Sequence, residues 1–126
     1  MAELVHKELS YIVVGVLFKV YNELGGGYQE KYYQRAITLE FKRHKLNFQE
    51  QVLVPLSFSG EKIGKYYLDF VIENKIVLEI KIEPRFYSRD IKQVLAYLKA
   101  TGLPLGLLAS FSKRELKFKR ILKGNK

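Results

Sequence analysis

The stretch IVLEIK, residues 76–81, places two charged side chains inside an apolar run. Its apolar residues alternate as in a strand with one buried face: Ile76, Leu78 and Ile80. Glu79 and Lys81 are two residues apart, so they share one face of that strand, about 6.6 Å apart along it. Charged side chains are rarely buried unless they are paired or coordinate an ion. The segment is therefore either an edge strand with one solvated face or a strand whose charged face lines a site.

The loop before this strand sets the register of the preceding hairpin. If residues 73–75 form a three-residue loop, Ile72 pairs with Ile76, and counting back places Asp69 opposite Glu79 on the same face. A two-residue loop would turn Asp69 to the other face, because side chains alternate with a period of two. An odd-length loop thus predicts two facing carboxylates.

Two facing carboxylates destabilise a sheet unless another charge compensates them. One interpretation is a cation held between Asp69 and Glu79. The other is a charge ladder on a solvated face, in which Lys81 offsets the acidic pair. The Glu-x-Lys pattern alone does not decide between these two interpretations, since Glu73 and Lys75 repeat it in a segment that is predicted to be a turn.

Hydrophobic periodicity extends the prediction to the whole chain. Apolar residues recur with a helical period in three segments: about 4–23, 28–45 and 88–101. They alternate, or form short buried runs, in five segments: 48–59, 62–72, 75–82, 103–111 and 115–122. The predicted order is ααβββαββ, an α/β (α+β) fold with a mixed β-sheet flanked by helices. We expect a single domain over residues 1–126, in which a crossover makes strand 103–111 parallel to strand 75–82.

The amino-acid composition excludes several kinds of catalytic and metal site. The 126 residues include no cysteine, which excludes disulfides, thiolate zinc sites and cysteine nucleophiles. The two histidines, His6 and His44, lie far apart in the sequence, which argues against a histidine-rich metal centre. Oxygen ligands favour Mg²⁺ or Mn²⁺. No signal peptide or membrane-spanning run stands out, so we expect no membrane association and a cytoplasmic location.

The formal net charge of +9 suggests a polyanionic partner, of which nucleic acid is the commonest. Seven Lys or Arg residues lie within residues 112–126, against the single acid Glu115. Three of them are candidate phosphate contacts on the last predicted strand: Lys117, Lys119 and Arg120. A solubilising surface remains the alternative interpretation of the same charge.

One glutamate lies in the first turn of the second predicted helix, within a glycine-rich motif. Glu30 lies in LGGGYQEKYY, residues 24–33, where an acid in the first helical turn ordinarily complements the helix dipole. The pattern Gly27-x-x-Glu30-x-x-Tyr33 resembles the signature of the GxxExxY proteins, a branch of the PD-(D/E)XK nuclease superfamily. The resemblance continues through residues 64–81 and 93–111, in the same order, and so covers nearly the whole chain.

This resemblance implies a restriction-endonuclease-like core and a nuclease that uses Mg²⁺ or Mn²⁺. It makes Asp69 and Glu79 metal ligands, with the carbonyl of Ile80 as a third and Glu30 as an additional acid. By the same resemblance Lys81 orients the attacking water and offsets charge on the phosphate. Gln93 matches a glutamine found on the helix after the catalytic strand.

Three positions depart from the family pattern: Tyr21 and Asp90 stand where relatives carry histidine, and Gly26 where they carry proline. The alternative to a nuclease is a catalytically inactive nucleic-acid-binding or accessory protein on the same fold. A basic interaction module without a nucleic-acid role is a third interpretation. At this chain length a homodimer or a partner protein would supply specificity for DNA or RNA.

Overall fold

The computed structural model describes residues 5–124 and shows the predicted order ααβββαββ over that range. The helices are α1 (Lys7–Leu24), α2 (Glu30–Arg43) and α3 (Ser88–Thr101). The strands are β1 (Phe48–Phe58), β2 (Glu61–Ile72), β3 (Ile76–Lys81), β4 (Leu105–Phe111) and β5 (Leu116–Leu122). The predicted start of the first helix near residue 4, and both ends of the predicted domain 1–126, lie outside the described residues.

The IVLEIK segment forms β3, the third strand of a sheet with the order β1-β2-β3-β4-β5. β3 runs antiparallel to β2 and, after the α3 crossover, parallel to β4. The predicted parallel pair is therefore confirmed. The interpretation of this segment as an edge strand is wrong, because β3 has a hydrogen-bonded neighbour on each side. Glu79 is only 5% exposed.

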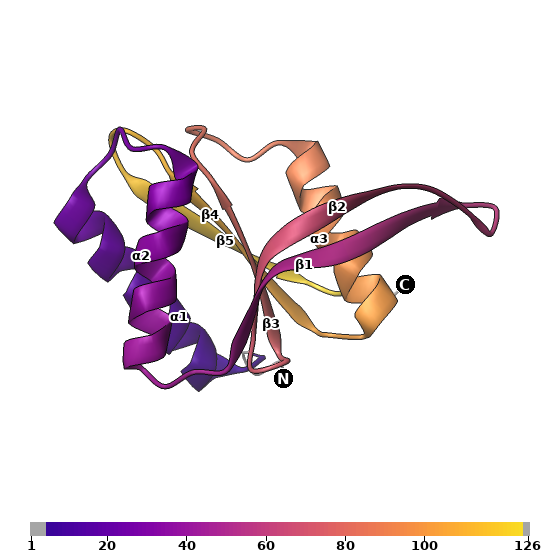
Figure 1. Cartoon of the computed structure of the whole chain (residues 1–126), viewed down its shortest axis with the longest axis horizontal. Coiled ribbons are helices and arrows are strands. Elements are labelled where there is room, and N and C mark those ends of the chain that lie inside the picture. The colour runs from indigo at the N-terminus through magenta and orange to yellow at the C-terminus, as the bar shows by residue number, and fades with distance from the viewer. Residues whose placement is uncertain (1–4, 125–126) are drawn as a thin grey trace.

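Helices cover both faces of the sheet. α1 and α2 pack on one face and α3 on the other, as Figure 1 shows. The first face buries Phe70 and Leu78 against the two N-terminal helices. The second buries Val77 with Val94 and Leu98 of α3. Within residues 5–124, no helix combines the length and apolar character needed to cross a bilayer.

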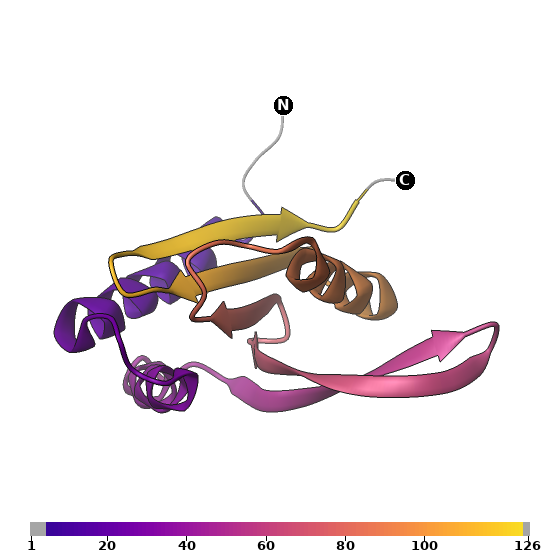
Figure 2. The same cartoon turned by 90° about the horizontal axis from the view of Figure 1, so that it is seen from above.

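The loop between β2 and β3 has three residues, as the register argument required. Glu73 and Asn74 adopt positive φ angles of 55° and 53°, and Ile72 pairs with Ile76. Backbone pairing between the two strands ends at Phe70 and Leu78. Beyond that point β1 and β2 continue as a two-stranded arm that projects from the body (Figure 2). The sheet therefore opens at the residues that follow in the register, Asp69 and Glu79.

Candidate active site

Asp69 and Glu79 bridge the point where β2 and β3 separate. The backbone N–H of Asp69 donates to Oε1 of Glu79 at 3.0 Å, and the backbone N–H of Ile80 donates to Oδ2 of Asp69 at 2.8 Å. Each carboxylate thus accepts a backbone hydrogen bond from the opposite strand, where regular pairing has ended. The two acids are 6% and 5% exposed. The structure brings them together as the odd-length loop predicted.

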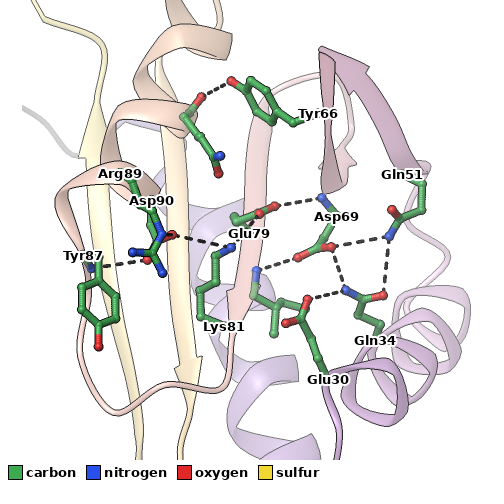
Figure 3. Close-up of polar contacts among 12 residues, drawn as sticks. Glu30, Gln34, Gln51, Tyr66, Asp69, Glu79, Lys81, Tyr87, Arg89 and Asp90 are labelled. Carbon is green, nitrogen blue, oxygen red and sulfur yellow. Dashed lines mark hydrogen bonds and ion pairs between the residues drawn. The ribbon is translucent and has the colours of Figure 1, made fainter. Parts of the chain in front are cut away.

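The glycine-rich motif places a third acid beside this pair. The hydroxyl of Tyr33 donates to the carbonyl of Gly25 at 2.6 Å and accepts the N–H of Tyr28 at 3.3 Å, while its ring is buried against Phe111. This anchor holds the turn that begins α2. Glu30 is the first residue of that helix, and its carboxylate lies on the side that faces β2 (Figure 3).

Two glutamine side chains link the acids, and sequence reasoning missed both. Nε2 of Gln34, one turn after Glu30, donates to Glu30 Oε2 at 3.0 Å and to Asp69 Oδ1 at 2.7 Å. Gln51 of β1 lies between the paired residues Glu50 and Val52 and has its Nε2 3.5 Å from Asp69 Oδ1. Its φ of 51° breaks the regular β1 backbone, as bulges near active sites do. The i, i+4 spacing from Glu30 is the one sequence signal that pointed to Gln34.

Lys81 lies between two carboxylates. Its Nζ is 3.5 Å from Oε2 of Glu79 and 3.6 Å from Oδ1 of Asp90, which is 3% exposed (Figure 3). Asp90 also accepts the N–H of Tyr87, the N-cap of α3, at 3.3 Å. From the sequence, Asp90 was a departure from the family pattern and, with Ser88, a candidate cap for this helix. The structure makes it the residue that joins the start of α3 to the lysine.

The departures at Tyr21 and Gly26 also have local causes. The hydroxyl of Tyr21 donates to the carbonyl of Ser112 at 2.6 Å, which ties α1 to the turn after β4. A Cβ on Gly26 would lie 2.4 Å from the carbonyl oxygen of Lys113. The backbone of the β4–β5 turn therefore fills the space that a proline ring would need.

Burial sets the electrostatics of the acidic cluster. Burial, reinforced by the charge of Asp69, raises the pKa of Glu79 to about 8 and that of Glu30 to about 7. Burial also raises the pKa of Asp69, although the N–H of Ile80 opposes it. Burial alone would lower the pKa of Lys81, but the carboxylates around it, Glu79 and Asp90 foremost, raise it. The site therefore contains more carboxyl groups than its single lysine can neutralise.

The donors at this site suit a hard divalent cation. They are carboxylate and backbone oxygens, which Mg²⁺ and Mn²⁺ prefer. A cation would also relieve the repulsion that raises the acidic pKa values. No three His, Cys, Asp or Glu side chains within residues 5–124 already converge as a finished metal centre. The ligand set of Asp69, Glu79, Glu30 and the Ile80 carbonyl therefore stays a prediction.

Gln93 contacts the site region through its main chain. Its carbonyl accepts the hydroxyl of Tyr66 at 2.6 Å. Burial, and then the charge of Glu79, raise the pKa of Tyr66, so this tyrosine lies near the acidic pair. Among the described residues, the side chain of Gln93 makes no hydrogen bond, and its predicted role in catalysis is untested.

The three basic candidates on β5 do not lie together. Nη1 of Arg120 donates to Ser10 Oγ at 2.8 Å and Nη2 to the carbonyl of Val5 at 3.1 Å, so Arg120 faces α1. Lys117 and Lys119 alternate with it and point to the other face.

That other face carries the acidic cluster. Glu79 pairs with Leu108 of β4, which pairs with Lys119, so these three side chains share one face of the sheet. Lys81 is joined to Lys117 in the same way through Ser110. The two lysines thus lie two strands from the site, at about 10 Å.

We expect Lys81 and Asp90 to be energetically coupled. A double-mutant cycle with Lys81→Met and Asp90→Asn should give a coupling free energy of about 1 kcal/mol or more, because both groups are largely removed from water. Urea unfolding of the four proteins measures it. The pair Arg89→Gln and Asp90→Asn is the matched control, since Arg89 is exposed and contacts Asp90 only at 3.9 Å. Coupling no larger than in the control would show that Asp90 does not hold Lys81.

Comparisons with known proteins agree with this fold. The family model described as PD-(D/E)XK nuclease superfamily matches residues 7–121. The crystal structure of SSO0001 is similar, with a TM-score of 0.58 and 19% identity over 95% of this chain and 60% of that one. An alkaline exonuclease from Laribacter hongkongensis is similar as well, with a TM-score of 0.53 and 13% identity over 99% of this chain and 73% of that one. This chain thus spans less than two thirds of SSO0001.

None of the curated proteins compared with the chain matches it. The two structural likenesses support the restriction-endonuclease-like fold, and the family match extends from the start of α1 to one residue before the end of β5. With the buried Asp69 and Glu79 and the adjacent Lys81 in place on β2 and β3, the assignment follows: the chain belongs to the PD-(D/E)XK nuclease superfamily.

Proposed function

We propose that this protein is a nuclease that hydrolyses phosphodiester bonds of DNA or RNA with a divalent cation, Mg²⁺ or Mn²⁺. One observation carries the proposal. Two buried carboxylates, Asp69 and Glu79, face each other where the sheet opens, with the ammonium group of Lys81 beside them. An acidic pair is costly to bury, and a cation-dependent reaction supplies a reason for it.

Asp69, Glu79, the Ile80 carbonyl and Glu30 would hold the cation. A cation bound there would polarise a phosphoryl oxygen and lower the pKa of the attacking water. Lys81 donates hydrogen bonds to the attacking water and offsets negative charge on the phosphate, and Asp90 keeps its Nζ beside Glu79. The carboxylate of Glu79 orients Lys81 as well.

The finer assignments are part of the same proposal. The turn before α2, where the Tyr33 hydroxyl donates to the Gly25 carbonyl and Glu30 begins the helix, supports membership of the GxxExxY branch. The cysteine-free composition supports a cytoplasmic location. A homodimer or partner protein that supplies specificity fits the small size of the domain. We also propose that Gln93 acts in catalysis, on the resemblance alone.

A catalytically inactive nucleic-acid-binding or accessory protein is the second candidate. The observation in its favour is that Asp69 and Glu79 already accept backbone hydrogen bonds and are nearly covered. The hydrogen bonds of this pair are complete without a substrate, so the fold could be retained for binding alone.

A cleavage screen separates the two candidates. Purified wild type is incubated with single- and double-stranded DNA and RNA, in Mg²⁺, in Mn²⁺ and in EDTA, beside Asp69→Asn prepared in the same way. The nuclease proposal expects products with wild type in at least one cation and none in EDTA or with Asp69→Asn. Binding without cleavage under every condition would favour the accessory protein.

Nucleic-acid binding should depend on Lys117 and Lys119. Both lie on the face that carries the acidic cluster, so replacing each by Gln should reduce the log–log salt slope of duplex binding by about 0.9. Fluorescence anisotropy at several salt concentrations measures the slope. Arg120→Gln is the control: it should lower the melting temperature, because Arg120 holds α1, and change the slope less. Equal slopes for wild type and the lysine variants would mean that these charges only solubilise the protein.

A further inference from the structure

The amide group of Gln34 lies between two carboxylates that come from different elements. Its Nε2 is 3.0 Å from Oε2 of Glu30 on α2 and 2.7 Å from Oδ1 of Asp69 on β2 (Figure 3). An amide nitrogen carries two hydrogens, so it donates one to each acid. The other end of the amide, Oε1, faces Nε2 of Gln51 at 3.5 Å. The nitrogen of Gln34 is therefore kept toward the acids from both sides.

A positive charge at this place would also stabilise the site. Glu30 and Asp69 repel each other there, and Lys81 lies on the other side of the cluster, between Glu79 and Asp90. A neutral amide offers each acid one hydrogen bond but no net charge, so it compensates the repulsion only in part. A group that donates a hydrogen bond to each of two acids is well suited to stabilise them when the cation is absent.

We propose that Gln34 is a positioning residue whose amide nitrogen stands in for the divalent cation between Glu30 and Asp69, and that it thereby lowers the affinity of the site for that cation. The proposal rests on the cation-dependent function proposed above. A cation that engages Glu30 and Asp69 must compete with the two Gln34 hydrogen bonds. Gln34 therefore stabilises the cation-free protein and opposes cation binding.

Two substitutions at this position have opposite expected effects. Gln34→Met keeps an unbranched side chain but donates no hydrogen bond. In EDTA it should lower the melting temperature, and it should tighten Mn²⁺ binding by on the order of tenfold, since each 1.4 kcal/mol removed from the cation-free state is one factor of ten. Gln34→Lys places an ammonium group between the acids. It should melt above wild type in EDTA, and it should no longer bind Mn²⁺ or be stabilised by it.

The experiment measures melting temperatures in EDTA and Mn²⁺ dissociation constants by calorimetry for wild type, Gln34→Met and Gln34→Lys. Gln49→Lys is the matched control, because Gln49 is an exposed glutamine of β1 that receives the same charge away from the amide. This control should keep the wild-type Mn²⁺ affinity within a small factor. No step requires a nucleic-acid substrate.

A glutamine that only supports the fold predicts a different outcome: Gln34→Met would weaken Mn²⁺ binding or leave it unchanged, and Gln34→Lys would melt below wild type in EDTA. Either result overturns the role of Gln34 while wild-type Mn²⁺ binding leaves the proposed function standing. If wild type itself binds no Mn²⁺, the cation-dependent function fails and this proposal fails with it.

Discussion

Lys81→Met is expected to reduce cation-dependent cleavage by on the order of a hundred- to a thousandfold, the usual cost of losing one group that stabilises transition-state charge. Methionine keeps an unbranched side chain, one atom shorter, but removes the positive charge and the three N–H donors of the ammonium group. The ammonium group lies beside Glu79 and Asp90, so the loss should appear in kcat more than in nucleic-acid binding. Single-turnover cleavage with the best substrate of the screen measures the effect.

Lys75→Met is the matched control for this prediction. Lys75 follows Glu73 in another Glu-x-Lys tripeptide of the chain, but it is exposed in the β2–β3 loop. Its replacement should leave cleavage unchanged. Circular dichroism and melting curves establish that Lys81→Met is folded. Cleavage by a folded Lys81→Met protein at the wild-type rate would place the reaction elsewhere in the molecule.

The second large effect concerns stability and pH. Burial and the charge of Asp69 raise the pKa of Glu79 from 4.5 to about 8 in the folded protein. Between these values the folded state holds a proton that the unfolded state has lost, so the free energy of unfolding falls as the pH rises. The contribution is fully present below pH 4.5 and is lost by about pH 8. Glu30, with a pKa of about 7, contributes with the same sign.

Glu79→Gln should therefore melt as high as wild type in EDTA at pH 5 and higher than wild type at pH 9. The glutamine keeps an oxygen that accepts the N–H of Asp69 but carries no charge. With Mn²⁺ at pH 9, wild type should instead melt higher than Glu79→Gln. A hundredfold excess over its dissociation constant stabilises wild type by about 2.7 kcal/mol, roughly 10 °C, and the variant by much less.

Thermal melts of both proteins at pH 5, 7 and 9, with EDTA or Mn²⁺, test this pattern. Glu73→Gln serves as the control glutamate outside the cluster. A variant that is less stable than wild type in EDTA at every pH would identify Glu79 as a structural partner of Lys81. In that case the charge-ladder interpretation would hold, and the nuclease proposal would lose its central observation.

The contacts that were predictable from the sequence are close along the chain. The hairpin of β2 and β3 encloses only residues 73–75, so one assumption about loop length fixed the register and brought Asp69 opposite Glu79. Periodicity found every helix and strand of the described residues within a few positions. The resemblance added Glu30, which no local pattern distinguishes from an ordinary first-turn glutamate.

The contacts that were missed join residues far apart in the sequence. Gln34 meets Asp69 across 35 positions, and Gln51 meets it through a break in the β1 backbone that alternation does not predict. The prediction that grouped Arg120 with Lys117 and Lys119 ignored the period of two, which sends Arg120 to α1.

The sequence by itself thus determined the order of elements, the central strand with its Glu-x-Lys pair, and the facing carboxylates, because these follow from periodicity and one short loop. Only the tertiary structure decided that β3 is buried on both faces, that Asp90 holds Lys81, and that Gln34 links Glu30 to Asp69. The physical reason is that these depend on how α2 and α3 pack across the two faces of the sheet. That packing is set by buried side chains from the whole chain, such as Tyr33 and Val94, rather than by the residues of the site.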